Sequence, residues 1–221
     1  MALSKKEQAA LIRLFKQSFK CEDLKSVSVD DQTQQVNVTA GRVVMRVKGH
    51  IPVKLGVVIG GFDCSNCELQ NLNNGPHTIT ESFSCSNNNL TTLQDGPLHV
   101  GSKDQYIYIY SCGDNPLINF KGMPSDFTGR VIANYSSNHG LPQLQSVDGI
   151  PATCRNLELS YSPTLPMLKL LELNLITIYD HGFKVHPITY ILTKYKGQGK
   201  AGAIKAAVEM IRAGYKENAR W

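Results

Sequence analysis

The chain has few of the features that mark a membrane-spanning, secreted or strongly charged protein. One tryptophan occurs in 221 residues, charged residues make up 19%, and the formal net charge is +5. No uninterrupted apolar run is long enough to cross a bilayer, and the N-terminal stretch contains no apolar segment of the signal-peptide kind. We therefore expect a cytoplasmic protein with no membrane partner, whose cysteines remain thiols.

The chain also lacks the motifs of common enzyme classes. It has no G-x-S-x-G elbow and no H-E-x-x-H pair, and its histidines are expected to face solvent. The stretch KYKGQGKAG at residues 194–202 is not a Walker A loop, because one residue separates its glycines where that loop needs four. We therefore predict a non-enzymatic protein with no catalytic residues and no cofactor.

One C-x-x-C pair, Cys64 and Cys67 in FDCSNCEL, suggests a metal or redox site. A structural zinc ion needs four converging ligands, and the sequence contains no second C-x-x-C and no H-x-x-x-H pair. A thioredoxin-like dithiol is expected near a βαβ pattern, which is missing here. We therefore predict no metal site.

Three segments in the middle of the chain share one pattern without gaps. They read FDCSNCELQNLNNGP from Phe62, FSCSNNNLTTLQDGP from Phe83 and YSCGDNPLINFKGMP from Tyr110. Each begins with an aromatic residue and has Cys at the third position, Leu at the eighth, Leu or Phe at the eleventh and Pro at the fifteenth. Their starts are 21 and 27 residues apart, and self-similarity at such a period is typical of a solenoid.

Two weaker copies follow these three. ANYSSNHGLPQL from Ala133 and LELSYSPTLPML from Leu157 align with each other without gaps, so we expect Ala133 and Leu157 to occupy matching places. A further stretch, LELNLITIYD, is expected to close the sheet. In the shared frame Cys64, Cys85 and Cys112 occupy one inward-facing position. They predict a column of buried thiols, because cysteine packs as a small hydrophobe.

The pattern resembles the leucine-rich repeat in its short bacterial form, with Asn88 and Asn115 at the asparagine of that consensus. The resemblance implies that these side chains hydrogen-bond the backbone of the turn, a role that Cys67 fills only weakly at the same position. The repeats at residues 57–178 and the tail at 194–221 also resemble those of small proteins encoded by tailed bacteriophages. This second resemblance implies a viral accessory protein in the bacterial cytoplasm that acts on host proteins or is recognised by them.

We predict an α/β-type, leucine-rich-repeat-like solenoid: a stack of short parallel strands with an α/β N-terminal cap and a helical C-terminal cap. Such a stack needs caps because its ends would otherwise expose the core. The expected boundaries are residues 1–56 for the first cap, 57–180 for the solenoid and 181–221 for the second cap.

The two caps have sequence signals of their own. Residues 4–20 predict a helix with a capping box at Ser4 and Glu7. The alternating stretches VSVDDQTQQVNV and RVVMRV predict a β-hairpin and a further strand. A last helix is predicted, with Gly214 as its C-cap glycine. Its apolar face consists of Ile204, Ala207, Val208 and Ile211.

The outward residues of the strands are small, polar and mostly uncharged, and the usual hot-spot types Trp, Tyr and Arg are nearly missing among them. We take as the candidate partner-binding face Ser65, Asn66, Ser86, Asn87, Asp114, Ser136 and Tyr161. The tail is the most basic region of the chain. Its candidate basic patch consists of Lys194, Lys196 and Lys200.

The favoured function is a protein-interaction module with an unidentified protein partner, since solenoids offer extended binding surfaces. Two alternatives remain open. One is a self-assembling structural protein that forms a ring or another homo-oligomer through its flat polar face. The other is a nucleic-acid-binding accessory factor whose basic tail holds phosphates.

Overall fold

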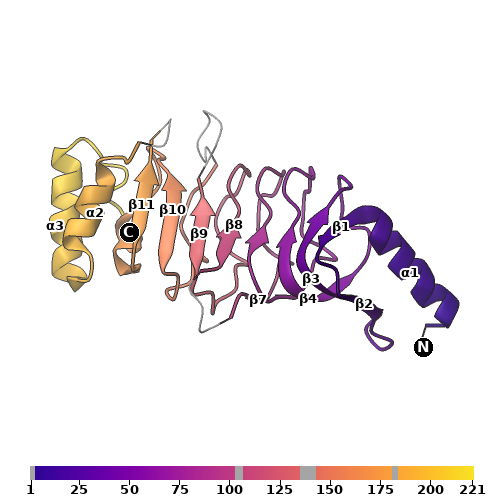
Figure 1. The fold of residues 1–221 in the computed structure, drawn as a ribbon. Coiled ribbons are helices and arrows are strands. Elements are labelled where there is room, and N and C mark those ends of the chain that lie inside the picture. The colour runs from indigo at the N-terminus through magenta and orange to yellow at the C-terminus, as the bar shows by residue number, and fades with distance from the viewer. Residues whose placement is uncertain (1–2, 103–106, 135–142, 181–183) are drawn as a thin grey trace.

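The computed structural model describes residues 3–102, 107–134, 143–180 and 184–221, which form a parallel-strand β-solenoid of about six turns. Figure 1 shows the strands side by side, with α1 (Lys5–Ser18) at one end. Two further helices, α2 (Ile188–Tyr195) and α3 (Gly199–Arg212), lie at the other end. The predicted solenoid of parallel strands, with helices near the C-terminus, is therefore confirmed.

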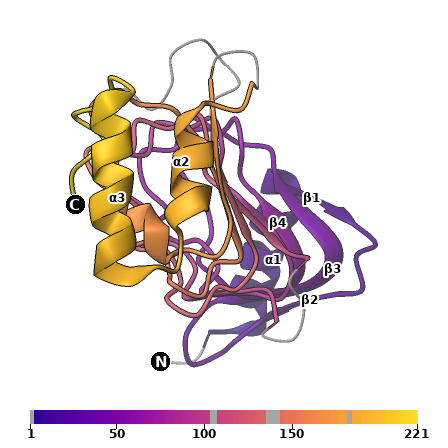
Figure 2. The same cartoon turned by 90° about the vertical axis from the view of Figure 1, so that its left-hand side faces the viewer.

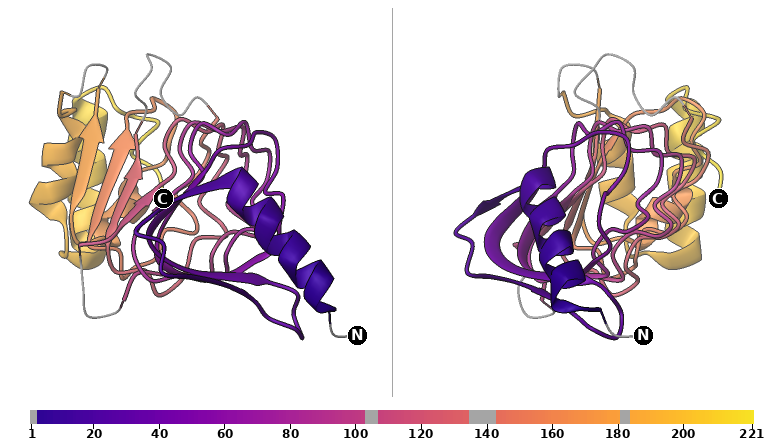
Figure 3. Two further views of the ribbon diagram at one scale, coloured as in Figure 1. Left: turned by 45° about the vertical axis from the view of Figure 1, so that its right-hand side comes forward. Right: turned by 90° about the vertical axis from the view of Figure 1, so that its right-hand side faces the viewer.

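The N-terminal end combines α1 with three strands. The predicted capping box is present: the Ser4 hydroxyl accepts from the Glu7 N–H, and the Glu7 carboxylate accepts from the Ser4 N–H at 2.8 Å. The expected hairpin consists of β2 (Ser26–Val29) and β3 (Val36–Met45), and β1 (Phe19–Glu22) pairs antiparallel with the other part of β3. Figure 3 shows α1 lying across this end of the stack.

From β3 onward the main sheet is parallel. The strands that follow β3 in the sheet are β4 (Leu55–Asp63), β6 (Phe83–Ser84), β8 (Ile109–Ser111), β9 (Arg130–Ala133), β10 (Asn156–Ser160) and β11 (Ile176–Tyr179). A short second ladder, β5 (Thr78–Ile79) and β7 (His99–Val100), extends from the first half of β4. Phe62 pairs with Phe83 and Phe83 with Tyr110, as the alignment of the three segments predicts.

The register of the two weaker copies differs from the predicted one. Leu157 lies opposite Val131, and Ala133 lies opposite Leu159, so the expected match of Ala133 with Leu157 is wrong by two residues. Side chains alternate faces with a period of two along a strand, so a shift of two keeps every residue on its predicted face. The apolar pattern alone therefore could not distinguish the two registers.

Aromatic rings form a continuous column through the core. Phe15 stacks on Phe19 at a centroid distance of 4.9 Å, and the column continues through Phe62, Phe83, Tyr110 and Phe127 at 5.0–6.2 Å. All these side chains are buried. Among the described residues the Tyr110 hydroxyl has no hydrogen-bond partner. The column joins α1 to the repeats, so the helix and the solenoid share one core.

The C-terminal end contains the 3-10 helix η1 (Leu168–Glu172), which precedes β11, and the helices α2 and α3, which follow it. Figure 2 shows α2 and α3 side by side. The α3 helix ends at Arg212, and the predicted cap glycine Gly214 follows the C-cap residue Ala213 with a φ of 90°. The Tyr215 N–H donates to the Met210 carbonyl at 2.8 Å and the Gly214 N–H donates to Ile211, which together form a Schellman motif. No helix in the described part of the chain is long and apolar enough to cross a membrane.

The predicted apolar face of the last helix lies outward rather than against the core. Ile204, Val208 and Ile211 are 58%, 41% and 52% exposed, and Ala207 is half-buried. The buried face of α3 consists of Gly202, Ala203, Ala206 and Met210. The small side chains on that face let the helix approach its neighbours closely, which explains why the more apolar face remains outside.

Candidate interaction surfaces

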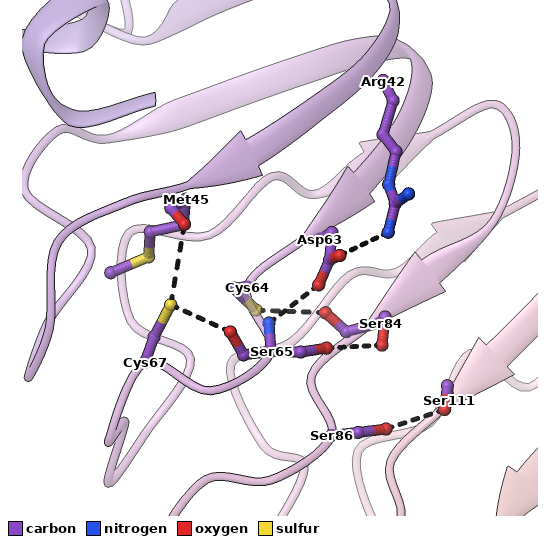
Figure 4. A network of polar contacts seen from close by, with 9 residues as sticks. All are labelled: Arg42, Met45, Asp63, Cys64, Ser65, Cys67, Ser84, Ser86 and Ser111. Carbon is purple, nitrogen blue, oxygen red and sulfur yellow. Dashed lines mark hydrogen bonds and ion pairs between the residues drawn. The ribbon is translucent and has the colours of Figure 1, made fainter. Parts of the chain in front are cut away.

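The repeated cysteines form the predicted buried column. Cys64, Cys85 and Cys112 are each 0% exposed, and the Cys64 thiol donates to the Ser84 carbonyl at 3.4 Å (Figure 4). Burial raises the pKa of all three thiols, that of Cys112 to about 12. Thiols in this state are poor nucleophiles and poor metal ligands, because both roles need the thiolate. In the described part of the chain no three His, Cys, Asp or Glu residues gather to hold a metal ion.

The buried side chain of Asn88 bridges two successive turns. Its Oδ1 accepts from the N–H groups of Cys67 at 3.0 Å and Leu69 at 2.9 Å, both in the preceding turn. Its Nδ2 donates to the carbonyl oxygens of Cys64 and Cys85 at 2.9 Å each. The expectation that this asparagine hydrogen-bonds the turn backbone is confirmed, and the bonds link neighbouring turns as well.

The same position in the adjacent turns extends the ladder. The Asn115 amide donates to the Cys85 carbonyl at 2.9 Å, and its Oδ1 accepts from the Leu90 N–H at 3.1 Å. Cys67 stands at this position in the earliest of the three copies, where its thiol donates to the Ser65 carbonyl at 3.2 Å (Figure 4). Cys64 and Cys67 therefore belong to separate columns, as predicted.

The tail supplies a buried amide that the sequence did not predict. Ser162 stands at the asparagine position of the last copy, five residues after Leu157. Asn218 is 0% exposed, and its Nδ2 donates to the Ser162 and Leu165 carbonyls at 2.9 and 2.8 Å. No local pattern around Asn218 could reveal this role, because its partners are more than 50 positions away in the chain.

Side chains where the strands end form a polar strip that consists of Ser65, Asn66, Ser84, Ser86, Asn87, Ser111 and Asp114. Its hydroxyls pair across the strands, with Oγ–Oγ distances of 2.6 Å between Ser65 and Ser84 and 2.7 Å between Ser86 and Ser111 (Figure 4). The Asn87 amide donates to Asn66 Oδ1. The structure thus brings five of the predicted face residues into one strip, where most of the polar groups already bind one another.

Two other predicted face residues have different outcomes. Ser136 lies outside the described residues. Tyr161 stacks on His186 with ring centroids 3.8 Å apart, and its hydroxyl donates to Asn218 Oδ1. His186 is only 5% exposed, so the expectation that the histidines face solvent is wrong for this residue. These contacts attach the last turn to the C-terminal helices.

Two arginines lie on the outward face of the sheet, where the sequence predicts almost no arginine. Arg42 forms an ion pair with Asp63 on the next strand (Figure 4), and Arg130 forms one with Glu158. The Glu158 side chain is only 8% exposed. The signal that could have placed both arginines outward is the period of two along a strand, because each arginine directly precedes a buried valine, Val43 or Val131.

A groove of about 960 Å³ lies between η1 and α3. We call it the C-terminal groove. Its apolar walls come from Leu168, Leu171, Leu173, Ala203, Ile204, Ala207 and Trp221, and its charged lining residues are Glu172, Lys196 and Lys200. Trp221, the sole tryptophan of the chain, is 65% exposed. Because its walls come from segments far apart in sequence, no local motif predicted the groove.

The three lysines of the predicted basic patch have separate environments. Lys194 forms an ion pair with Glu209 at 2.8 Å, which raises the pKa of this lysine. Lys196 donates to the Asn174 carbonyl and lines the C-terminal groove with Lys200. Two of the three predicted lysines therefore border an apolar groove, and the third is neutralised by a carboxylate.

Comparisons with protein-family models, with curated proteins and with solved structures find no match to this chain.

Proposed function

We propose that this protein is a non-enzymatic module that binds another protein, and that a segment of the partner occupies the C-terminal groove. The observation that carries the proposal is the apolar lining of this groove together with the exposure of Trp221. Large exposed apolar patches mark interaction sites, and tryptophan is among the side chains that contribute most to binding energy.

The polar strip is a weaker candidate for the binding surface. Its serine hydroxyls and asparagine amides bind one another, so a partner would have to break these contacts to form its own. Two arginines on the same face of the sheet, Arg42 and Arg130, are paired with Asp63 and Glu158. Replacing one set of hydrogen bonds with another yields little net free energy, whereas burial of apolar groove surface is favourable.

The setting we propose is that of a viral accessory protein in the cytoplasm of a bacterial host. The support is the resemblance of the repeats to the leucine-rich repeat and of the repeats and tail to proteins of tailed bacteriophages. The ladder through Asn88 and Asn115 is in keeping with the role that the leucine-rich-repeat resemblance implies. In this proposal α1 with its adjoining strands, and α2 with α3, serve as the caps of the stack.

The proposal is tested by affinity capture from host lysate with three forms of the protein. Ile204→Glu places a charge in the groove at a side chain that is already 58% exposed. Leu98→Glu is the matched control, because Leu98 is 66% exposed but belongs to a turn in the middle of the stack. We expect the wild type and Leu98→Glu to retain the same proteins after nuclease treatment, and Ile204→Glu to lose them.

Equal capture by all three forms would show that the groove is not the binding surface. Capture that disappears with nuclease, and with Lys196→Ala and Lys200→Ala, would instead favour the nucleic-acid alternative.

A further inference from the structure

The last strand of the sheet does not offer a free edge at its centre. The Ile178 N–H donates to Thr189 Oγ1 at 2.9 Å, and the Ile178 carbonyl accepts from the His186 N–H at 2.8 Å. Both partner residues belong to α2 or to the segment leading into it. A partner that added a strand to β11 would have to displace these bonds, so the C-terminal end does not suit strand addition.

On the exposed side of α3 the apolar side chains are instead spaced so that a helix of a partner could pack against them. Ile204, Val208 and Ile211 follow one another at i, i+4 and i+7, so they form a single stripe along the helix. At a rise of 1.5 Å per residue the stripe is about 10 Å long, or two helical turns. Ile204 and Ala207 also line the C-terminal groove. Groove and stripe are therefore one continuous apolar surface beside a helix, as in helix-in-groove recognition.

The charges around this surface are mainly positive. Lys196 and Lys200 line the groove, and Lys205 and Arg212 are exposed on α3. The acidic residue of α3, Glu209, accepts from Lys194 and from the Tyr195 hydroxyl. In η1, on the opposite side, Lys169 forms an ion pair with Asp148 at 2.6 Å, and Glu172 is the one acidic side chain among the described residues that line the groove. Two copies of this chain packed face to face would bring like charges together, so the surface favours an acidic partner over a second copy.

We propose that the occupant of the C-terminal groove is an amphipathic helix of another protein that carries acidic residues beside its apolar face. Its apolar side chains pack against Trp221, Ile204 and the stripe of α3, and its carboxylates lie against Lys196 and Lys200. The inference rests on the proposed function, because it names the chemistry of the partner segment that this function requires.

The test is selection from a displayed library of random 16-residue peptides on the full-length protein, with counter-selection on the Ile204→Glu variant. The expected result is enrichment of peptides with apolar residues at i, i+3 or i+4 and i+7 and with Asp or Glu beside them. The best peptide, synthesised with a fluorophore, should bind Lys196→Glu/Lys200→Glu at least about tenfold more weakly than wild type, because two attractive contacts become repulsive. A Glu→Lys version of the peptide should recover affinity for that double variant.

Three outcomes would overturn the inference. The first is enrichment of basic or extended sequences, or no enrichment. The second is binding that the charge reversal leaves unchanged. The third is an Ile204-dependent dimer of the protein at tens of micromolar in sedimentation, which would assign the surface to a second copy. If lysate capture depends on Ile204 but the selection yields no acidic peptide, the proposed function stands and only the inference of an acidic helical partner is overturned. If the Ile204→Glu variant captures the same proteins as wild type, both the proposed function of the groove and the acidic helical partner are overturned.

Discussion

Replacing Asn88 with alanine tests whether the side-chain ladder holds successive turns together. The substitution removes the acceptor for the N–H groups of Cys67 and Leu69 and the donor to the Cys64 and Cys85 carbonyls. Asn88 is 7% exposed, so water cannot easily replace the lost bonds. Leaving two buried N–H donors unpaired costs about 1–3 kcal/mol each, and we therefore expect a loss of about 4 kcal/mol in the free energy of unfolding.

The assay is equilibrium unfolding in urea, followed by far-UV circular dichroism at pH 7. A loss of about 4 kcal/mol would be a large part of the stability of a typical domain, which is about 5–15 kcal/mol. Asn89→Ala is the matched control, because the adjacent Asn89 is exposed; a change below about 0.5 kcal/mol is expected there. A loss below about 1 kcal/mol for Asn88→Ala would refute the reasoning, since the ladder would then contribute no more than one ordinary hydrogen bond.

A second variant separates the two halves of the amide. Asn88→Asp keeps the oxygen that accepts from Cys67 and Leu69 but places a carboxylate oxygen against the Cys64 and Cys85 carbonyls. We expect a large destabilisation at pH 7 that decreases at lower pH relative to wild type, because a protonated carboxyl can donate to one of those carbonyls. An Asn88→Asp variant as stable as wild type at pH 7 would show that the donor half of the amide contributes nothing.

Three further predictions concern the core and the C-terminal end. Burial raises the pKa of the cysteines, and Cys21 is the one cysteine that is not fully buried. Ellman's reagent should therefore label about one thiol quickly in the native protein and none in Cys21→Ser. Fast labelling of two or more thiols would contradict the buried columns. Tyr110→Phe should leave the free energy of unfolding in urea unchanged or raise it by about 1 kcal/mol, because the buried hydroxyl that it removes has no hydrogen-bond partner among the described residues. A clear loss of stability would contradict this and would mean that the hydroxyl does form a hydrogen bond. Burial lowers the pKa of His186, and its Nδ1 accepts from the Ile188 N–H. The unfolded chain therefore binds a proton at this histidine more readily than the folded chain does. Stability should fall as pH decreases below about 6.5. Unfolding midpoints between pH 7.5 and 5 should decrease less in His186→Gln, and equal slopes would exclude this histidine as the source.

Several features of the fold could be predicted because they depend on patterns that repeat along the chain. The spacing of Phe62, Phe83 and Tyr110 predicted both the stack and the register of its first three copies. The inward thiols followed from the alternation of faces along each strand. The two columns of Cys64 and Cys67 could be separated because the neighbouring copies keep the first cysteine and replace the second with asparagine.

The candidate site was predicted only in part. Lys196 and Lys200 were selected because they are basic, and the structure adds the apolar walls between which they lie. The predicted strip residues Ser65 and Ser86 do lie together, but their hydroxyls are hydrogen-bonded to those of Ser84 and Ser111. Which polar groups remain available to a partner depends on cross-strand contacts, and a single sequence does not contain those contacts.

The sequence by itself determined the repeat, the strand faces, the capping box at Ser4 and the cap glycine Gly214, because each depends on a repeated pattern or on residues close together in the chain. Tertiary structure decided which face of α3 is buried. Both of its faces contain apolar residues, and the face with the smaller residues is buried because it permits closer packing against the rest of the protein. Tertiary structure also buried His186 and Asn218 and assembled the C-terminal groove from η1, α3 and Trp221. These features depend on long-range packing, and residues that meet only after folding leave no local pattern to read.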